Sequence, residues 1–248
     1  MANPYVQTGF RARFDWGLTG ARNLAPDVAV VAVFDVLSFT TALSVAIDNG
    51  IEVFPFRWRD ERAEAFAAEH DAVLAVGRSK AGPGQISLSP PTIRAAQGVR
   101  RLVLPSPNGS TIAHDVAELG ATVIGVSLRN AAAAADWTIR GLGPGASVAA
   151  IAAGERWPDG ELRPAVEDLW GAGAYLAALA ERGFGQLSPE AEAAAGAYPA
   201  DDIAARLRAS AGGQELIGWN YASDVDIAAE LDSTTLVPLL AGESFTSA

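Results

Sequence analysis

The 248-residue sequence contains no cysteine and only two histidines. The absence of cysteine excludes disulfide bonds, thiolate nucleophiles and zinc sites built from sulfur ligands. Because His70 and His114 are the only histidines, a histidine-rich transition-metal site is not expected. If the chain binds a metal, oxygen ligands and hence Mg²⁺ are favoured. A sequence without cysteine also fits a cytoplasmic protein.

Long apolar runs and an excess of basic residues are missing as well. No run approaches the roughly 18 apolar residues that a membrane-spanning helix needs, and residues 1–14 lack the apolar core of a signal peptide. The 18 lysines and arginines are outnumbered by 29 aspartates and glutamates, which gives a net charge of −11. This charge repels phosphate backbones, so we expect neither a nucleic acid nor a membrane as partner. An anionic substrate would need a bound cation or a local group of arginines.

The residues that are abundant predict a large α/β protein. Half of the residues are hydrophobic and 19% are charged, and short apolar runs alternate with alanine-rich helical stretches. The run 28–34 ends at Asp35 and suits a strand buried on both faces. Further strands are expected at 51–56, 73–76, 101–104, 121–126 and 148–152, with a last apolar run at 235–240. Helices are expected at 39–47, 60–69, 110–119, 130–139, 164–181 and 226–231.

This alternation is typical of βαβ units. It predicts a three-layer α/β/α fold with a largely parallel or mixed sheet. We expect one unit over residues 1–248, with residues 188–213 forming an appended helical lobe or lid. The alanine-rich composition is compatible with a homo-oligomer, although no feature of the sequence fixes the oligomeric state.

Polar loops follow several of the expected strands. Ligands of parallel α/β sheets bind outside the carboxyl ends of the strands, where helix N-termini present free N–H groups. Asp35 ends the first buried run, and Asn108 opens a loop after the run 101–104. Glu167 and Asp168 stand in the first turn of a later helix. Together these loops predict a site for an anion and a metal ion.

Each of these residues also has a purely structural interpretation. Asp35 could cap a helix, as could three nearby hydroxyl residues, Ser38, Thr40 and Thr41. The Asn108-Gly109 pair is at least a tight turn, or else a backbone nest for an anion. Leu37 stands where haloacid dehalogenase-type phosphatases need a second carboxylate, which disfavours that family.

The neighbours Glu167 and Asp168 cannot both be expected to face the core. Adjacent helical residues point about 100° apart, since a helix has 3.6 residues per turn. Acidic residues in a first turn are favoured by the helix dipole without any function. The small residues at 171–174 predict close packing of this helix start against the sheet, where a carboxylate could reach a metal.

Taken in order, the loops resemble those of the 2-phosphosulfolactate phosphatase (ComB-like) family. The resemblance covers most of the chain. It is carried by VVAVFDVLSFTTALSVAIDNG (30–50), PSPNGSTIA (105–113), SLRNAAA (127–133), AAGERWPDGELRPAVEDLWGAGA (152–174) and DVDIAAELDSTTLVP (224–238).

The resemblance implies a Mg²⁺-dependent phosphoric monoester hydrolase. The family removes phosphate from a small carboxylated and sulfonated phosphoester on the way to coenzyme M. The implied catalytic residues are Asp35, Asn108, Glu167 and Asp168, and the implied metal ligands are Asp35, Glu167 and Asp168. The candidate substrate-binding residues are Ser38, Thr40, Thr41, Arg78, Gly109, Ser110, Arg129 and Asn130. We expect metal-activated water as the attacking group.

The sequence departs from the family pattern at several charged positions. The family usually has an arginine where this chain has Ser38, and a further arginine is missing beside Ser110. Arg78, Arg129 and Arg156 are candidates to compensate. Three hypotheses follow: an active phosphatase for 2-phosphosulfolactate or a related phospho-hydroxyacid, a family member that binds a small anion without catalysis, and an enzyme for a phosphoester with fewer negative charges.

Overall fold

The computed structural model describes residues 3–57, 61–143 and 145–248. The central strand β2 (Val30–Phe34) is buried along its whole length and pairs in parallel with β6 and β7. Its side chains alternate between two separate cores: Val30, Ala32 and Phe34 face one, while Val31 and Val33 face the other. This alternation places β2 in the middle layer of a three-layer fold, as predicted.

The sheet is mixed and has the order β1–β7–β2–β6–β10–β11–β3–β5–β4. The strands are β1 (Ala12–Trp16), β3 (Glu52–Phe56), β4 (Val73–Leu74), β5 (Arg101–Pro105), β6 (Thr122–Gly125), β7 (Val148–Ala152), β10 (Pro238–Ala241) and β11 (Ser244–Ser247). Two groups of parallel strands, β1–β7–β2–β6 and β3–β5–β4, are joined by the antiparallel hairpin β10–β11. The predicted fold class is confirmed.

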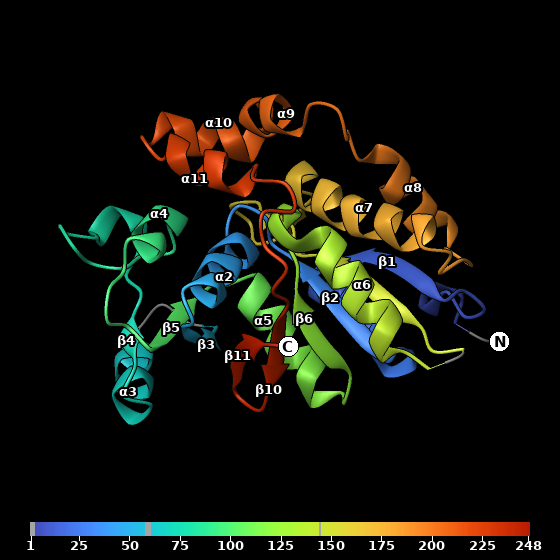
Figure 1. Cartoon of the computed structure of the whole chain (residues 1–248), viewed down its shortest axis with the longest axis horizontal. Helices are drawn as coiled ribbons and strands as arrows, with labels where there is room; N and C mark the ends of the chain where they lie inside the picture. The colour runs from blue at the N-terminus through green and yellow to red at the C-terminus, as the bar shows by residue number, and fades with distance from the viewer. Residues whose placement is uncertain (1–2, 58–60, 144) are drawn as a thin grey trace.

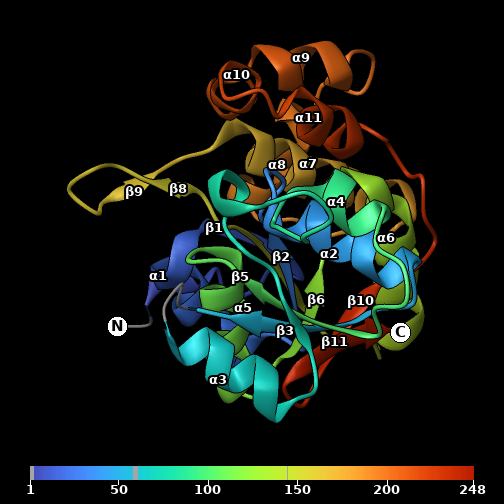
Figure 2. The ribbon, with the colours of Figure 1, turned by 90° about the vertical axis from the view of Figure 1, so that its left-hand side faces the viewer.

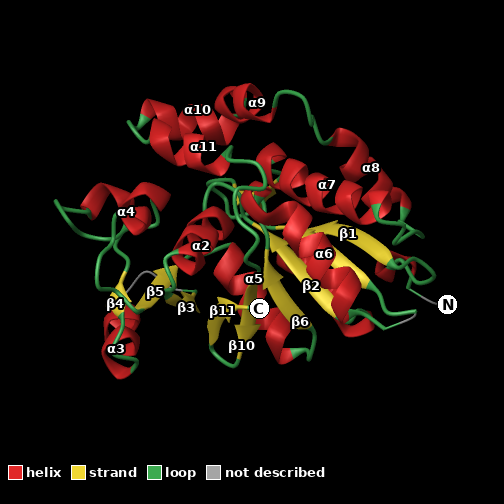
Figure 3. Ribbon diagram, viewed as in Figure 1, coloured by secondary structure: helices red, strands yellow, loops and turns green. Residues whose placement is uncertain are grey.

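Helices cover both faces of the sheet (Figures 1 and 3). One core is closed by α6 (Ala131–Gly141), α7 (Val166–Glu181) and α8 (Pro189–Ala197). The opposite core is closed by α1 (Gly17–Leu24), α2 (Phe39–Asp48), α4 (Pro90–Arg94) and α5 (Gly109–Glu118). A third, smaller core lies under α3 (Glu61–Glu69). No helix in the described ranges is both long and apolar enough to cross a membrane.

The segment expected as a helical lobe divides between a layer and a cap. α8 packs along α7 and belongs to one covering layer. α9 (Ile203–Ala209), α10 (Ala211–Gly218) and α11 (Ala222–Ala228) pack on one another above the rest of the chain (Figure 2). We call α9–α11 the C-terminal cap. The helix α11 begins at residue 222, four residues before the expected start at 226.

Twist brings the carboxyl ends of β2 and β5 together, although four strands separate them in the sheet. Neighbouring strands rotate by roughly 20–25°, so the twist from β2 to β5 turns the two parallel groups far out of line. Figure 2 shows β3 running across the direction of β2. The loops after β2 and β5 therefore meet, with the short hairpin of β8 (Glu155–Arg156) and β9 (Leu162–Arg163) projecting beside them.

Candidate active site

The carboxylate of Asp35 lies where the N-termini of two helices meet. Asp35 follows β2 and is only 6% exposed. Its Oδ1 accepts the N–H of Phe39, the first residue of α2, at 3.2 Å. Its Oδ2 accepts the N–H of Gly109, the first residue of α5, at 2.9 Å and the hydroxyl of Ser106 at 3.2 Å. Two helix dipoles thus favour negative charge at one point.

The residue at 109 must be small for this contact to form. A Cβ there would lie 2.5 Å from Cδ1 of Phe39 and 2.8 Å from Oδ2 of Asp35. The preceding Asn108 occupies the N-cap position of α5, but its side chain does not cap the helix. Its Nδ2 donates instead to Oε2 of Glu155 at 3.0 Å. The Asn-Gly pair therefore links the loop after β5 to both Asp35 and the end of β7.

Both acidic residues at the start of α7 are buried, contrary to the expectation that only one faces the core. Glu167 and Asp168 are each 3% exposed. Asp168 accepts the N–H groups of Val36 at 2.7 Å and Gly154 at 2.9 Å, which ties α7 to the loops after β2 and β7. Glu167 is covered by the C-terminal cap, where a Cβ on Gly212 would lie 2.2 Å from its Oε1. The cap therefore buries the side of the first turn of α7 that carries Glu167.

Glu155 is a site residue that the sequence reasoning did not select. It begins the β8–β9 hairpin directly after β7. Burial, aided by the charge of Asp35, raises the pKa of Glu155 to about 7. An acidic residue three positions after a buried strand, between glycine and arginine, was the available signal. We call Asp35, Glu155, Glu167 and Asp168 the acidic centre.

The electrostatics of the acidic centre disfavour full ionisation. Burial raises the pKa of Asp35 and of Glu167. The pKa of Asp168 is raised well above its usual range, first by burial and then by the charges of Asp35 and Glu167. Carboxylates that cannot all ionise together favour either shared protons or a bound cation.

Replacing Glu155 by glutamine is expected to stabilise the protein at alkaline pH. Because the folded-state pKa of Glu155 is raised from 4.5 to about 7, the ionised group destabilises the fold as the pH rises through that window. The shift corresponds to roughly 3 kcal/mol above pH 7. Glutamine carries no charge and can still accept from Asn108. In metal-free buffer, urea unfolding should give the variant and the unmodified protein equal stability at pH 4.5. At pH 8 the Glu155→Gln variant should be the more stable of the two.

The matched control is Glu161→Gln, which removes the same charge from an exposed position of the same hairpin. We expect its stability to follow that of the unmodified protein at both values of pH. If Glu155→Gln gave no gain at pH 8, the ionised carboxylate would not be the source of instability.

The acidic centre fits a sparsely ligated Mg²⁺ ion. Within the described ranges, no three acidic or histidine side chains lie close enough together to hold a metal by themselves. Mg²⁺, however, commonly binds through one or two carboxylates and completes its shell with water and substrate phosphate. An ionised carboxylate has about four acceptor positions. Protein donors use three of them at Asp35 and two at Asp168.

A basic residue, Arg78, lies beside the loop that follows β2. Its Nη2 contacts the hydroxyl of Ser38, and its Nε donates to Oδ2 of Asp224 at 2.8 Å. Asp224 belongs to the cap, is fully buried and also accepts the hydroxyl of Ser89. Arg78 therefore places a positive charge beside Ser38.

Three of the hydroxyl residues expected at the site hold the loops themselves. Thr40 Oγ1 donates to the carbonyl of Asp35 at 2.9 Å, and Thr41 Oγ1 donates to that of Val36 at 2.8 Å. Ser110 Oγ donates to Leu104 O at 3.3 Å. These contacts fit the structural interpretation of the three hydroxyl residues, because each hydroxyl binds the backbone that positions the acidic centre.

Arg129 and Asn130 lie outside the acidic centre. The guanidinium of Arg129 binds Ser44, Asp48 and Glu230. The amide of Asn130 binds groups of Ser127, Gly125 and Leu236. Their polar groups are thus engaged by the protein, so the expected role in substrate binding does not follow from their geometry. Arg156 is exposed and donates to Gly160 within the hairpin.

The arrangement offers the elements of phosphoryl transfer. Two helix N-termini and one arginine supply positive potential, and the acidic centre supplies oxygen ligands and proton acceptors. A phosphoryl group beside Asp35 would lie near the N-termini of α2 and α5 and near the carboxylates of the acidic centre. Catalysis of this kind depends on positioning and charge neutralisation.

The chain is similar to known proteins over most of its length. A model of the 2-phosphosulpholactate phosphatase family matches residues 19–243. A relative from Thermus thermophilus, named probable 2-phosphosulfolactate phosphatase, is 34% identical over 226 residues, or 88% of this chain and 89% of its own length. A relative of the same name from Deinococcus radiodurans is 30% identical over 225 residues, or 87% of this chain and 88% of its own.

Proposed function

Since this chain belongs to the 2-phosphosulpholactate phosphatase family, we propose that it is a Mg²⁺-dependent hydrolase of a small anionic phosphomonoester. The substrate is 2-phosphosulfolactate or a related phospho-hydroxyacid. The observation that carries the proposal is the Asp35 carboxylate, held by the N–H groups of two helix N-termini at the edge of an acidic centre.

The residues of the chain have separate roles in this reaction. Asp35, together with Glu167 or Asp168, would hold the Mg²⁺ ion. When bound, the ion would neutralise phosphoryl charge and lower the pKa of a water molecule. Arg78 binds a phosphoryl or carboxylate oxygen of the substrate. Glu155, with a pKa of about 7, is poised to accept a proton from the attacking water.

The test is a phosphate-release assay on the purified full chain. The panel contains 2-phosphosulfolactate, 2-phospholactate and phosphoglycolate, each with Mg²⁺ and with EDTA. We expect hydrolysis that requires Mg²⁺. Binding of these anions by calorimetry without turnover of any of them would favour the alternative of an anion-binding family member.

Replacing Gly109 by alanine is expected to lower kcat about 100-fold, because a displacement of about 1 Å at a catalytic group has an effect of this size. The new Cβ would push against the ring of Phe39 and against the carboxylate of Asp35. Steady-state kinetics with Mg²⁺ measure the change. The matched control is Gly141→Ala at the end of α6, where a Cβ meets nothing within 4 Å. Unchanged kcat in Gly109→Ala would show that this close contact does not position the site.

A further inference from the structure

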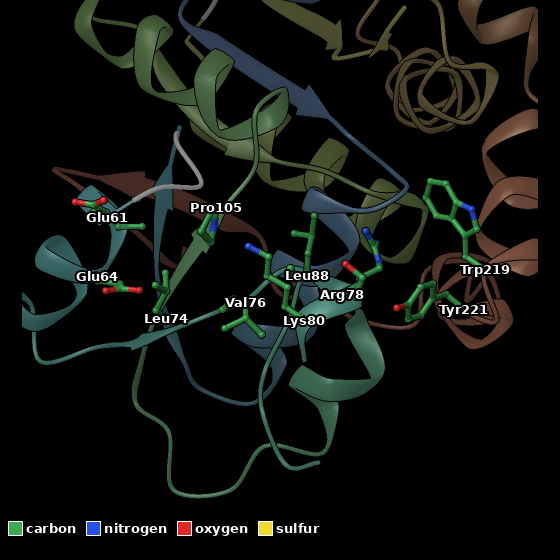
Figure 4. A pocket seen from close by; sticks show the side chains of 14 residues that line it. Glu61, Glu64, Leu74, Val76, Arg78, Lys80, Leu88, Pro105, Trp219 and Tyr221 are labelled. Atoms are coloured by element: carbon green, nitrogen blue, oxygen red, sulfur yellow. The ribbon is translucent and has the colours of Figure 1, made fainter. Parts of the chain in front are cut away.

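A large cleft is lined in part by Arg78. It has a volume of about 870 Å³ and lies between α3, the segment 74–80, the end of β5 and the C-terminal cap (Figure 4). Clefts that bury a drug-sized organic ligand have volumes of about 300–1,000 Å³. A three-carbon acid would leave most of this cleft empty.

Arg78 joins the cleft to the acidic centre. It lines the cleft, contacts Ser38 and lowers the pKa of Asp35 through its charge, although burial outweighs this effect. Its Nε and Nη2 are engaged, whereas Nη1 has no hydrogen-bond partner among the described residues. A substrate whose phosphoryl group lies beside Asp35 can therefore extend past this guanidinium into the cleft.

The walls of the cleft differ in chemistry from one end to the other. Trp219 and Tyr221, from the cap, line the end near Arg78, and Trp219 is 60% exposed. Lys80 lies between them and α3, where Glu61 and Glu64 line the far end. Exposed tryptophan and tyrosine favour a planar ring. The two glutamates disfavour a second anionic group at the far end.

We propose that this cleft binds an aromatic side group of the substrate, so that the substrate is the phosphoester of an aromatic 2-hydroxyacid. The phosphoryl group lies at the acidic centre, the carboxylate faces Arg78 and Lys80, and the ring packs against Trp219 and Tyr221. This inference rests on the proposed phosphatase function and specifies its substrate.

The kinetic test compares two esters that differ only by a ring, 2-phospho-3-phenyllactate and 2-phospholactate, on the full chain with Mg²⁺. We expect kcat/KM to favour the phenyl ester at least about tenfold. Trp219→Ala should abolish this preference by raising KM for the phenyl ester alone. Trp157→Ala, which removes another exposed tryptophan outside the cleft, should retain this preference.

A binding test separates failure of this inference from failure of the proposed function. Calorimetry with phenylphosphonate and methylphosphonate requires no turnover. Tighter binding of phenylphosphonate, lost in Trp219→Ala, supports the aromatic site even if neither ester is hydrolysed. Equal binding of the two phosphonates, or hydrolysis of both esters at equal kcat/KM, overturns the inference while leaving the phosphatase function in place.

Discussion

Replacing Asp35 by asparagine is expected to reduce kcat for phosphoester hydrolysis on the order of 10³-fold. The carboxylate accepts from the first N–H groups of α2 and α5 with different oxygens. An asparagine can satisfy only one of these donors, because its amide nitrogen would face the other. It also removes the charge that would hold a cation beside the phosphoryl group. The change is measured as kcat at saturating Mg²⁺, with circular dichroism to show that the variant is folded.

The control for this substitution lies at the other end of the same helix. Asp48, the last residue of α2, pairs with Arg129 at 2.9 Å, and a ten-residue helix separates it from the site by about 15 Å. Asp48→Asn is expected to lose some stability and to keep its kcat. Asp35→Asn with full Mg²⁺-stimulated activity would remove the proposed mechanism.

The parts of the fold that could be predicted are those with local signals. The run at 28–34 predicted a strand buried on both faces because it is continuously apolar, and β2, at residues 30–34, is such a strand. The approach of Asp35 to the Asn108-Gly109 turn followed from the rule that ligands bind outside the carboxyl ends of strands. That rule succeeded even though β2 and β5 belong to different parallel groups.

The parts that could not be predicted depend on contacts between distant segments. β1 carries Arg13 and Asp15 among its five residues, so it lacks the apolar run that marks β2. The apolar run 235–240 leads into the hairpin β10–β11, which the sequence did not indicate. Burial of Glu167 depends on Gly212 in the cap, 45 residues later in the chain, and no periodicity within α7 encodes that contact.

The raised pKa of Glu155 was hidden for a similar reason. Its cause is burial together with the charge of Asp35, which is 120 residues earlier in the sequence. A sequence reveals that a residue is acidic, but only the folded chain reveals which other carboxylates lie beside it. The acidic centre is therefore a property of the tertiary structure, although each of its members follows a strand or begins a helix.

Replacing Arg78 by methionine is expected to destabilise the protein by about 3 kcal/mol, because it leaves the fully buried Asp224 without its cation. Phosphatase activity should fall as well, since Arg78 is the basic group beside Ser38. These two losses have different causes and can be separated. Urea unfolding measures the first, and kcat/KM for the phosphoester measures the second.

The separating variant is the double substitution Arg78→Met with Asp224→Asn. Asparagine removes the unpaired buried charge and can still accept the hydroxyl of Ser89, so most of the lost stability should return. Activity should not return, because the Arg78 guanidinium is missing from both variants. If activity recovered together with stability, Arg78 would serve only to neutralise Asp224. If stability alone recovered, Arg78 would contribute to activity separately from its pairing with Asp224.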